Sequence, residues 1–252
     1  MSLDFTPRPE AAPRGRQVWI HGKMEAGLIL RNGEQLILAI IFPMMVLVGG
    51  RYIGDRLSLG FQELAPSVLG MVMWSSGLTT LAIATGFERR YNVLERLAAT
   101  PLGRDGILLG KALSIAMITF AQIVIFAVAG LILGWRPQFD PLALLVAIVV
   151  VVLSMGAFIG LGLALAGSLK PEQTLAIANM LYLAGLPLGI IVPLSLFPGW
   201  AQIPLSLLPT AALGETLRAA SAGEVLWLPL LVSAAWCVFA AWLARKVFQW
   251  MS

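Results

Sequence analysis

The sequence predicts an all-α protein that crosses a membrane several times, and two observations support this fold class. Of the 252 residues, 59% are hydrophobic and 12% are charged, about half the charged fraction of an ordinary soluble protein. Six stretches of 16 to 42 residues contain no Asp, Glu, Lys or Arg. A helix needs about 20 apolar residues to cross the hydrocarbon of a bilayer, and five stretches reach that length. We therefore expect six transmembrane helices.

The chain before the first span is expected to have two parts. Residues 1–17 contain three prolines and several charges, and we expect a disordered cytoplasmic tail there, followed by one transmembrane domain at 18–252. Residues 18–30 carry apolar side chains at helical spacing, with Trp19 as an interfacial anchor. The residues at helical spacing are Ile20, Met24, Gly27 and Leu28. The pattern favours a helix lying along the cytoplasmic face of the membrane, with a solvent-exposed connecting helix as the alternative.

The first span is predicted at residues 35–53 and is the shortest. Its uncharged stretch has 16 residues, which is about 24 Å of helix. Pro43 within it predicts a kink. At the inner end Arg31 and Glu34 stand three residues apart, a spacing at which opposite charges on a helix can pair.

The remaining spans are predicted at 64–87, 112–133, 142–168, 174–196 and 225–244. With six spans and a cytoplasmic N-terminus, the inner segments hold thirteen Lys and Arg residues and the outer loops hold four. Basic residues gather on the cytoplasmic side of membrane proteins, so both termini are expected inside. The net charge of +4 follows from these loops and needs no nucleic-acid partner.

The uncharged stretch at 173–214 is long enough for two helices, yet we predict only one span there. It contains five prolines, which interrupt a regular helix, and a seventh span would move the basic C-terminal end outside. We expect the span to break near Gly185, Pro187 and Gly189. The outer segment at 197–223 is then irregular and re-entrant, since irregular backbone at membrane depth must be covered by protein.

The scarcity of reactive side chains excludes several function classes. One cysteine, Cys237, and one histidine, His21, are too few for a disulfide framework or a metal cluster. The six uncharged stretches hold no ionisable side chain besides Cys237 and Tyr182, which argues against a proton-coupled transporter, a charged channel and a voltage sensor. No residues form a catalytic constellation or a Walker motif, so we expect no enzyme activity, cofactor or metal in this chain.

The charged loop between the second and third spans, residues 88–111, is the most informative polar segment. Its first part, residues 87–97, suits a short amphipathic helix, and Thr100 followed by Pro101 suits the start of the next helix. Such a segment, joined rigidly to two spans, can transmit force from a cytoplasmic partner. An ordinary basic loop that only fixes topology explains the same spacing equally well.

Two segments of this chain carry a resemblance to a known family. Residues 88–102 read ERRYNVLERLAATPL and are followed by LLGK at 108–111, and residues 31–36 read RNGEQL and run into Phe42 and Pro43. Together they resemble the ABC-2 type permeases, the membrane subunits of ABC exporters such as the daunorubicin-resistance type. The resemblance covers the chain from about Val18 onward. It departs at Gly103, where relatives often have a capping serine.

The resemblance implies a complex with other subunits. Such a permease pairs with a second permease, identical or related, and with two separate ATPase subunits that carry the ATP and magnesium. The loop would supply the coupling helix, around residues 90–98, which sits in a groove of the ATPase. The coupling residues would be Glu88, Arg89, Arg90, Tyr91, Val93, Leu94, Glu95, Arg96 and Leu97.

The resemblance also implies a substrate route, because in this family the route runs at the dimer interface along spans two and five. The polar candidates on those spans are Ser75, Ser76, Thr79, Thr80, Asn179 and Tyr182. Each of them can instead bond one helix to another, as Ser, Thr and Asn commonly do in membranes.

The expected function is an ATP-driven exporter that moves a hydrophobic or amphiphilic compound, such as a drug or a lipid, across the bacterial inner membrane. Spans rich in Leu, Met, Trp and Phe suit such a cargo. A structural or regulatory membrane subunit without its own translocation path is the alternative. The sequence leaves open the cargo and whether the two permeases are identical.

Overall fold

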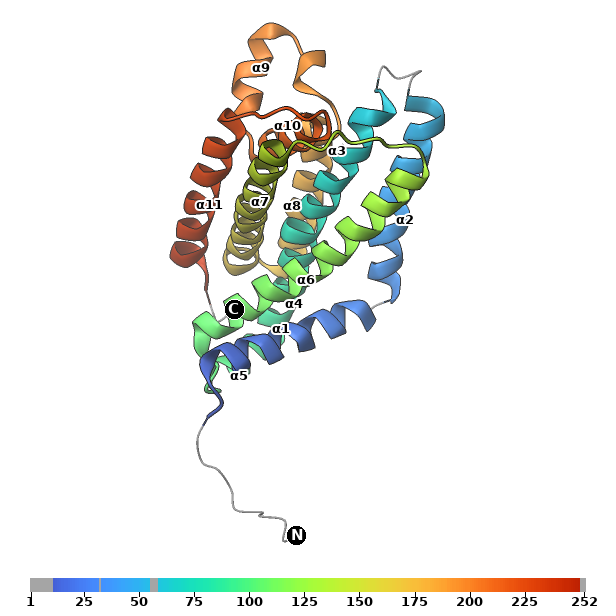
Figure 1. The fold of residues 1–252 in the computed structure, drawn as a ribbon. Helices are drawn as coiled ribbons and strands as arrows, with labels where there is room; N and C mark the ends of the chain where they lie inside the picture. The colour runs from blue at the N-terminus through green and yellow to red at the C-terminus, as the bar shows by residue number, and fades with distance from the viewer. Residues whose placement is uncertain (1–10, 32, 55–58, 250–252) are drawn as a thin grey trace, which may run out of the picture.

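The computed structural model describes residues 11–31, 33–54 and 59–249, and every regular element among them is a helix. Figure 1 shows long helices standing side by side, with α1 (Arg14–Arg31) lying across their lower ends. Five helices are long and apolar enough to cross a membrane. The predicted all-α fold with several membrane spans is therefore confirmed.

Helix α1 packs against the protein with one narrow face. Its buried residues are His21, Gly22, Glu25 and Ala26. The apolar residues Ile20, Met24 and Leu28 are each at least 50% exposed, so they point away from the protein, where a membrane surface would cover them. The helix begins at Arg14, so the end of the expected tail is helical. Residues 1–10 of that tail lie outside the described residues.

Helix α2 (Gly33–Ile53) contains Pro43 at the predicted place. Its described side chains from Ala39 to Ile53 form an apolar stretch, and the side chains at 34–38 lie outside the described residues. Arg31 ends α1 and is exposed. The side chain of Glu34 lies outside the described residues, so the pairing of Arg31 with Glu34 stays a prediction.

The next span is one continuous helical run from Phe61 to Arg90. It consists of α3 (Phe61–Trp74), a wider π-type stretch η2 (Ser75–Thr80) and α4 (Leu81–Arg90). The short helix α5 (Val93–Ala98) leads to α6 (Gly103–Ile132). The expected loop at 88–111 is therefore mostly helical, and α6 begins nine residues before the predicted span.

Helices α7 (Pro141–Ser168) and α11 (Leu228–Val247) pack closely along their length. Asp140 caps α7 by accepting a hydrogen bond from the Ala143 N–H at 2.7 Å, and a proline follows at the first helical position, as helix starts favour. A Cβ added at Gly160 would lie 2.8 Å from the Cβ of Ala240. The absence of a side chain at this glycine therefore allows the two backbones to approach.

Helix α8 (Pro171–Gly185) continues into the stretch η3 (Leu186–Ile190), where the backbone breaks. Gly189 has φ +98°, a left-handed conformation that glycine adopts without steric cost. A Cβ there would lie 2.4 Å from the Cα of Ala211, so close packing also requires glycine. The break lies where the prolines and glycines predicted it.

The outer segment that follows is helical, and the prediction of an irregular segment was wrong. It contains η4 (Leu194–Leu196), α9 (Gly199–Ser206) and α10 (Pro209–Ser221). Pro198 and Pro209 fall at helix starts, where a missing N–H costs little, whereas Pro204 lies inside α9. Figure 1 shows α10 tucked among the outer ends of the long helices, with α9 above it. Most of α10 is buried.

A buried arginine ties α10 to the break in α8. Arg218 donates hydrogen bonds to the carbonyl oxygens of Gly189 and Ile190 at 2.9 and 2.7 Å. It also bonds the Ser67 hydroxyl at 2.8 Å and the Glu215 carboxylate at 2.7 Å. Backbone groups released by a helix break need such partners inside a membrane protein, and Arg218 supplies them.

Candidate functional site

A polar hollow lies between α2, η2, α4 and α8. Its volume is about 470 Å³, and its wall combines apolar residues with hydroxyl and amide groups. The polar wall residues are Ser75, Thr79, Thr80, Asn179 and Tyr182. Five of the six residues predicted from spans two and five thus surround one space, although 99 residues separate Thr80 from Asn179.

Ser76 is the sixth candidate, and it does not line the hollow. Its side chain is buried and donates a hydrogen bond to the Gln122 amide oxygen of α6 at 2.8 Å. Ser76 therefore bonds one helix to another, the alternative role for these residues.

The π-type stretch η2 shapes the hollow from the middle of its span. One turn of a π-helix holds more residues than an α-turn, and such turns are frequent at functional sites. On the opposite side η2 packs closely against α7, and two glycines allow this contact. A Cβ added at Gly77 would lie 2.8 Å from the Cβ of Phe158, and a Cβ added at Gly162 would lie 2.8 Å from the carbonyl oxygen of Gly77. The buried Thr79 hydroxyl has no hydrogen-bond partner among the described residues.

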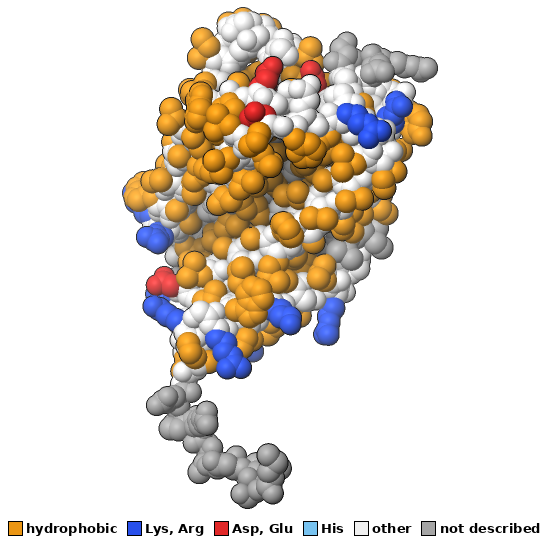
Figure 2. Space-filling view, viewed as in Figure 1, with side chains coloured by type: hydrophobic (Ala, Val, Ile, Leu, Met, Phe, Trp, Pro, Cys, Tyr) orange, Lys and Arg blue, Asp and Glu red, His pale blue; other side chains and the backbone are white. Residues whose placement is uncertain are grey.

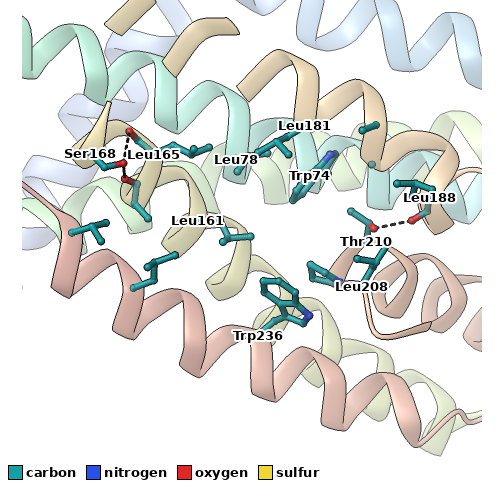
Figure 3. Close-up of a pocket in the computed structure, with 16 residues that line it drawn as sticks. Trp74, Leu78, Leu161, Leu165, Ser168, Leu181, Leu188, Leu208, Thr210 and Trp236 are labelled. Atoms are coloured by element: carbon teal, nitrogen blue, oxygen red, sulfur yellow. Dashed lines mark hydrogen bonds between the residues drawn. The ribbon is translucent and has the colours of Figure 1, made fainter. Parts of the chain in front are cut away.

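A second cavity of about 400 Å³ is almost wholly apolar and lies on the other side of the contact between η2 and α8. In Figure 3, Trp74 and Trp236 enter this space from opposite walls. Its two hydroxyl groups bond to backbone oxygens, Thr210 to Leu188 at 2.8 Å and Ser168 to Ala164 at 2.7 Å. Because these groups are satisfied internally, the cavity offers a ligand mainly apolar contact. Trp74 lines the apolar cavity and donates a hydrogen bond at 3.3 Å to the carbonyl oxygen of Tyr182, which lines the polar hollow.

The segment predicted to contact a partner divides into buried and exposed residues. Leu94 is 1% exposed and packs with Leu102 and Ile107. Tyr91 is 63% exposed, and Glu95 and Arg96 on α5 are also exposed. Leu94 therefore anchors α5 to the protein, and Tyr91, Glu95 and Arg96 form the surface that another protein can reach.

The backbone of this segment differs from the single helix that was predicted. Asn92 adopts a left-handed conformation with φ 56°, which asparagine tolerates better than most residues, and it separates α4 from α5. Thr100 does not cap α6. Its hydroxyl donates to the Leu97 carbonyl oxygen at 2.6 Å, so it closes α5, and α6 begins only at Gly103.

Three charged residues of the predicted coupling segment instead hold the helices together. Arg89 is 6% exposed and donates to the carbonyl oxygens of Gly167 and Leu169 at the end of α7. Arg90 forms an ion pair with Glu172 on α8, on the protein surface. Glu88 pairs with Lys111 of α6. These contacts join the Arg90 end of the Phe61–Arg90 run to α6, α7 and α8.

Lys111 is the centre of a buried charge cluster at the inner end of the molecule. It is 1% exposed and pairs with Glu25 of α1 at 3.1 Å as well as with Glu88. His21 lies 3.7 Å from Glu25. Burial lowers the pKa of the His21 imidazole from its ordinary value, and the positive charge of Lys111 acts in the same direction, whereas Glu25 opposes it. The cluster fixes α1 to α4 and α6.

The sequence contained signals for these buried charges that the loop prediction did not use. His21 and Glu25 stand four residues apart on one face of α1. Glu88 and Lys111 border two adjacent uncharged stretches, so a tight hairpin of spans brings them to the same depth. Among the described residues, no group of three or more His, Cys, Asp or Glu side chains is placed to hold a metal ion.

A bundle of apolar helices with a polar hollow at the middle of two spans and a charged helical segment at one end defines a multi-pass membrane protein of the transporter class. The ABC-2 type transporter family model matches residues 16–221. The chain belongs to this family. It is also 24% identical over 203 residues to a protein of Porphyra purpurea that carries the name transport permease ycf38, in an alignment that covers 75% of this chain and 68% of the relative.

Proposed function

We propose that this chain is the membrane-spanning subunit of an ATP-driven exporter of the daunorubicin-resistance type. It moves a hydrophobic or amphiphilic compound across the bacterial inner membrane. The chain crosses the membrane six times, with α2 as the short first span, both termini in the cytoplasm and α9 and α10 re-entering from the outer side. It works with a second permease, and two separate ATPase subunits bind ATP and magnesium.

The observation that carries this proposal is the continuity of the helical run from Phe61 to Arg90. Its middle forms one wall of the polar hollow through η2, and its inner end leads directly into the exposed surface of α5. A helix is stiff along its axis, so a displacement at α5 that passes through the two-residue turn at Tyr91 and Asn92 reaches the wall of the hollow along one helical run. A transporter needs this mechanical link between a motor subunit and a cargo site.

The exposed rim of the hollow supports the pairing with a second permease. Phe42 of α2 is 43% exposed, and Asn179 and Leu183 of α8 are exposed as well. An amide at membrane depth on a lipid-facing surface is unfavourable. A partner helix packed over this rim would cover Asn179 and convert an open hollow into an enclosed path.

The proposal is tested by reversing the exposed charges of α5. Glu95→Lys combined with Arg96→Glu is expected to leave membrane insertion unchanged, because neither side chain is buried. The assay uses vesicles that contain the complex with its ATPase. We expect the rate of ATP hydrolysis stimulated by an added hydrophobic fluorescent dye to fall by about an order of magnitude, because charges at the edge of a protein–protein interface govern how the partners associate. Glu224→Lys, an exposed charge reversal beyond α10, serves as the control.

Two outcomes would decide against the proposal. Unchanged hydrolysis and dye transport in the α5 variant would show that the ATPase does not engage this surface. A wild-type complex that assembles, but whose hydrolysis never responds to any membrane-soluble compound, would favour the alternative of a structural or regulatory subunit.

A further inference from the structure

A second amphiphilic site lies outside the polar hollow, at the inner end of the molecule. A pocket of about 900 Å³ lies between α1, the start of α6 and the end of α11. Arg14 and Arg245 contribute to its lining although 231 positions separate them in the sequence. Neither arginine forms an ion pair with another described residue. Both guanidinium groups thus line one pocket without a carboxylate partner among the described residues.

The charge of this pocket suits a phosphodiester. Asp105 also lines it, so two arginines and one aspartate give a net charge of +1, opposite to the single negative charge of a phosphodiester. Arginine binds phosphate oxygens through two parallel N–H groups. The Asp105 carboxylate can accept hydrogen bonds from hydroxyl groups of the same headgroup.

The rest of the pocket is apolar, and its residues suit the interface between membrane and water. Val18, Trp19, Leu108, Leu109 and Leu113 line it beside the arginines. Trp19 is 52% exposed and Leu109 is 59% exposed, which indicates contact with lipid for a helix end at the membrane surface. Tryptophan concentrates at the headgroup level of bilayers, and basic pockets at the cytoplasmic ends of spans bind anionic headgroups.

An apolar groove continues from this pocket along α6. It has a volume of about 520 Å³, lies between α6 and α7, and shares Leu113 with the basic pocket. Its α6 wall runs from Ala112 to Ile123. Leu113 and Ile123 stand ten positions apart on the helix, a rise of about 15 Å, which is half of the roughly 30 Å hydrocarbon thickness. Figure 2 shows hydrophobic side chains over this face of the molecule and basic side chains gathered at its lower margin.

We propose that the basic pocket and this groove together bind one anionic phospholipid of the inner leaflet. The phosphate lies between Arg14 and Arg245, and one acyl chain follows the groove between α6 and α7. The site is distinct from the polar hollow, which lies between α2, η2, α4 and α8. Binding of a lipid at this site can be measured without transport, so the result of the experiment does not depend on whether the protein is an exporter.

The experiment measures which lipid the purified protein retains. The protein is exchanged into nanodiscs with equal parts of phosphatidylglycerol and phosphatidylcholine, released gently, and examined by native mass spectrometry. We expect preferential retention of one phosphatidylglycerol molecule. Arg14→Gln combined with Arg245→Gln should reduce the preference by about 30-fold, because each basic residue near a membrane contributes about 1 kcal/mol to anionic lipid binding and every 1.4 kcal/mol is a factor of about ten.

The matched control removes the same charge from the same two helices. Arg16→Gln combined with Lys246→Gln changes exposed basic residues that do not line the pocket, and it should keep the preference. Ala116→Trp fills the groove and should reduce retention, whereas Ala121→Trp, exposed on α6 outside the groove, should not. Thermal unfolding of each variant verifies that it is folded.

Three results would overturn the proposal. One is equal retention of the two lipids by the wild-type protein. Another is an equal loss of preference in the pocket pair and the control pair, which would indicate a general surface potential. The third concerns free phosphate: if inorganic phosphate in phosphatidylcholine nanodiscs stabilises the protein as strongly as phosphatidylglycerol does, the pocket is a phosphate site rather than a lipid site.

Discussion

Adjacent residues of the charged segment have different roles, and Arg89 and Arg90 illustrate this. Arg89 is buried against two backbone oxygens at the end of α7, whereas Arg90 pairs with Glu172 at the surface. The spacing of charges in the sequence does not distinguish them, because the rotation of α4 relative to α7 is set by packing far along the helix. Assigning all three charges at 88–90 to a partner surface overlooked this.

Arg89→Ala is expected to reduce the free energy of unfolding by about 1–3 kcal/mol, since it leaves two carbonyl oxygens without their partner in a buried place. Arg90→Ala should cost well under 1 kcal/mol, because exposed ion pairs contribute little. Thermal unfolding in detergent measures both. Equal losses in the two variants would contradict the assignment of Arg89 as a structural contact.

His21 gives the inner end of the molecule a pH dependence. Its folded-state pKa lies below the ordinary value of 6.5, so the unfolded chain binds the proton first as the pH falls. The contribution to stability is complete above about pH 6.5 and is lost as the pH falls from there through the folded-state pKa. Unfolding temperatures measured between pH 7.5 and 5 should decline for the wild type and decline less for His21→Asn. Parallel curves would show that another group titrates.

At the scale of elements, the packing of η2 against α7 depends on the glycine at position 77. A Cβ at Gly77 would come within 2.8 Å of Phe158, and overpacking of this kind costs about 1–3 kcal/mol. Gly77→Ala should therefore destabilise the protein. Gly49→Ala in α2, where nothing lies within 4 Å, should be neutral or stabilising by up to about 1 kcal/mol.

The measurement is again thermal unfolding, with ATP hydrolysis as a second readout for Gly77→Ala. If Gly77→Ala unfolds at the same temperature as the wild type, α7 does not pack on η2 as closely as the structure shows. A loss in Gly49→Ala of the same size would mean that the effect is general to glycines in the spans.

The sequence predicted the break in α8 but not what stabilises it. Pro187 and Gly189 disfavour a continuous helix through local chemistry alone, so the position was readable. Arg218 was counted only as an outer positive charge, yet it binds the carbonyl oxygens of Gly189 and Ile190. Its role depends on α10 folding back over η3, and that contact joins residues 28 and 29 positions apart.

At the scale of the whole molecule, five of the six predicted spans overlap helices that are long and apolar enough to cross a membrane, because the requirement for apolar length is local. Helix starts were predicted less well. Helix α6 extends through the charged residues before Lys111, since Lys111 finds acidic partners on α1 and α4 and can be buried inside the helix bundle. The amphipathic pattern of α1 was read correctly as a helix, and its apolar side faces away from the protein.

The candidate site was predicted only in part, because the sequence shows which residues are polar but not which way each of them faces. Polar residues in apolar spans are visible in the sequence, and five of six line one hollow. Ser75 and Ser76 are neighbours with opposite surroundings, one at the hollow and one bonded to α6. Only the three-dimensional rotation of η2 assigns them, and an α-helical wheel misplaces residues beyond a π-type turn.

The wide turn of η2 also has a geometric consequence for the wall it forms. It accommodates one residue beyond the α-helical register, and this surplus is not bound to one position by covalent structure. If the surplus residue moved along the run toward Arg90, every side chain that it passed would rotate about the helix axis by about 100°. Each residue would then take the place of a direct neighbour, so an apolar residue such as Leu78 would replace one of the two threonines, and the wall would lose one hydroxyl group.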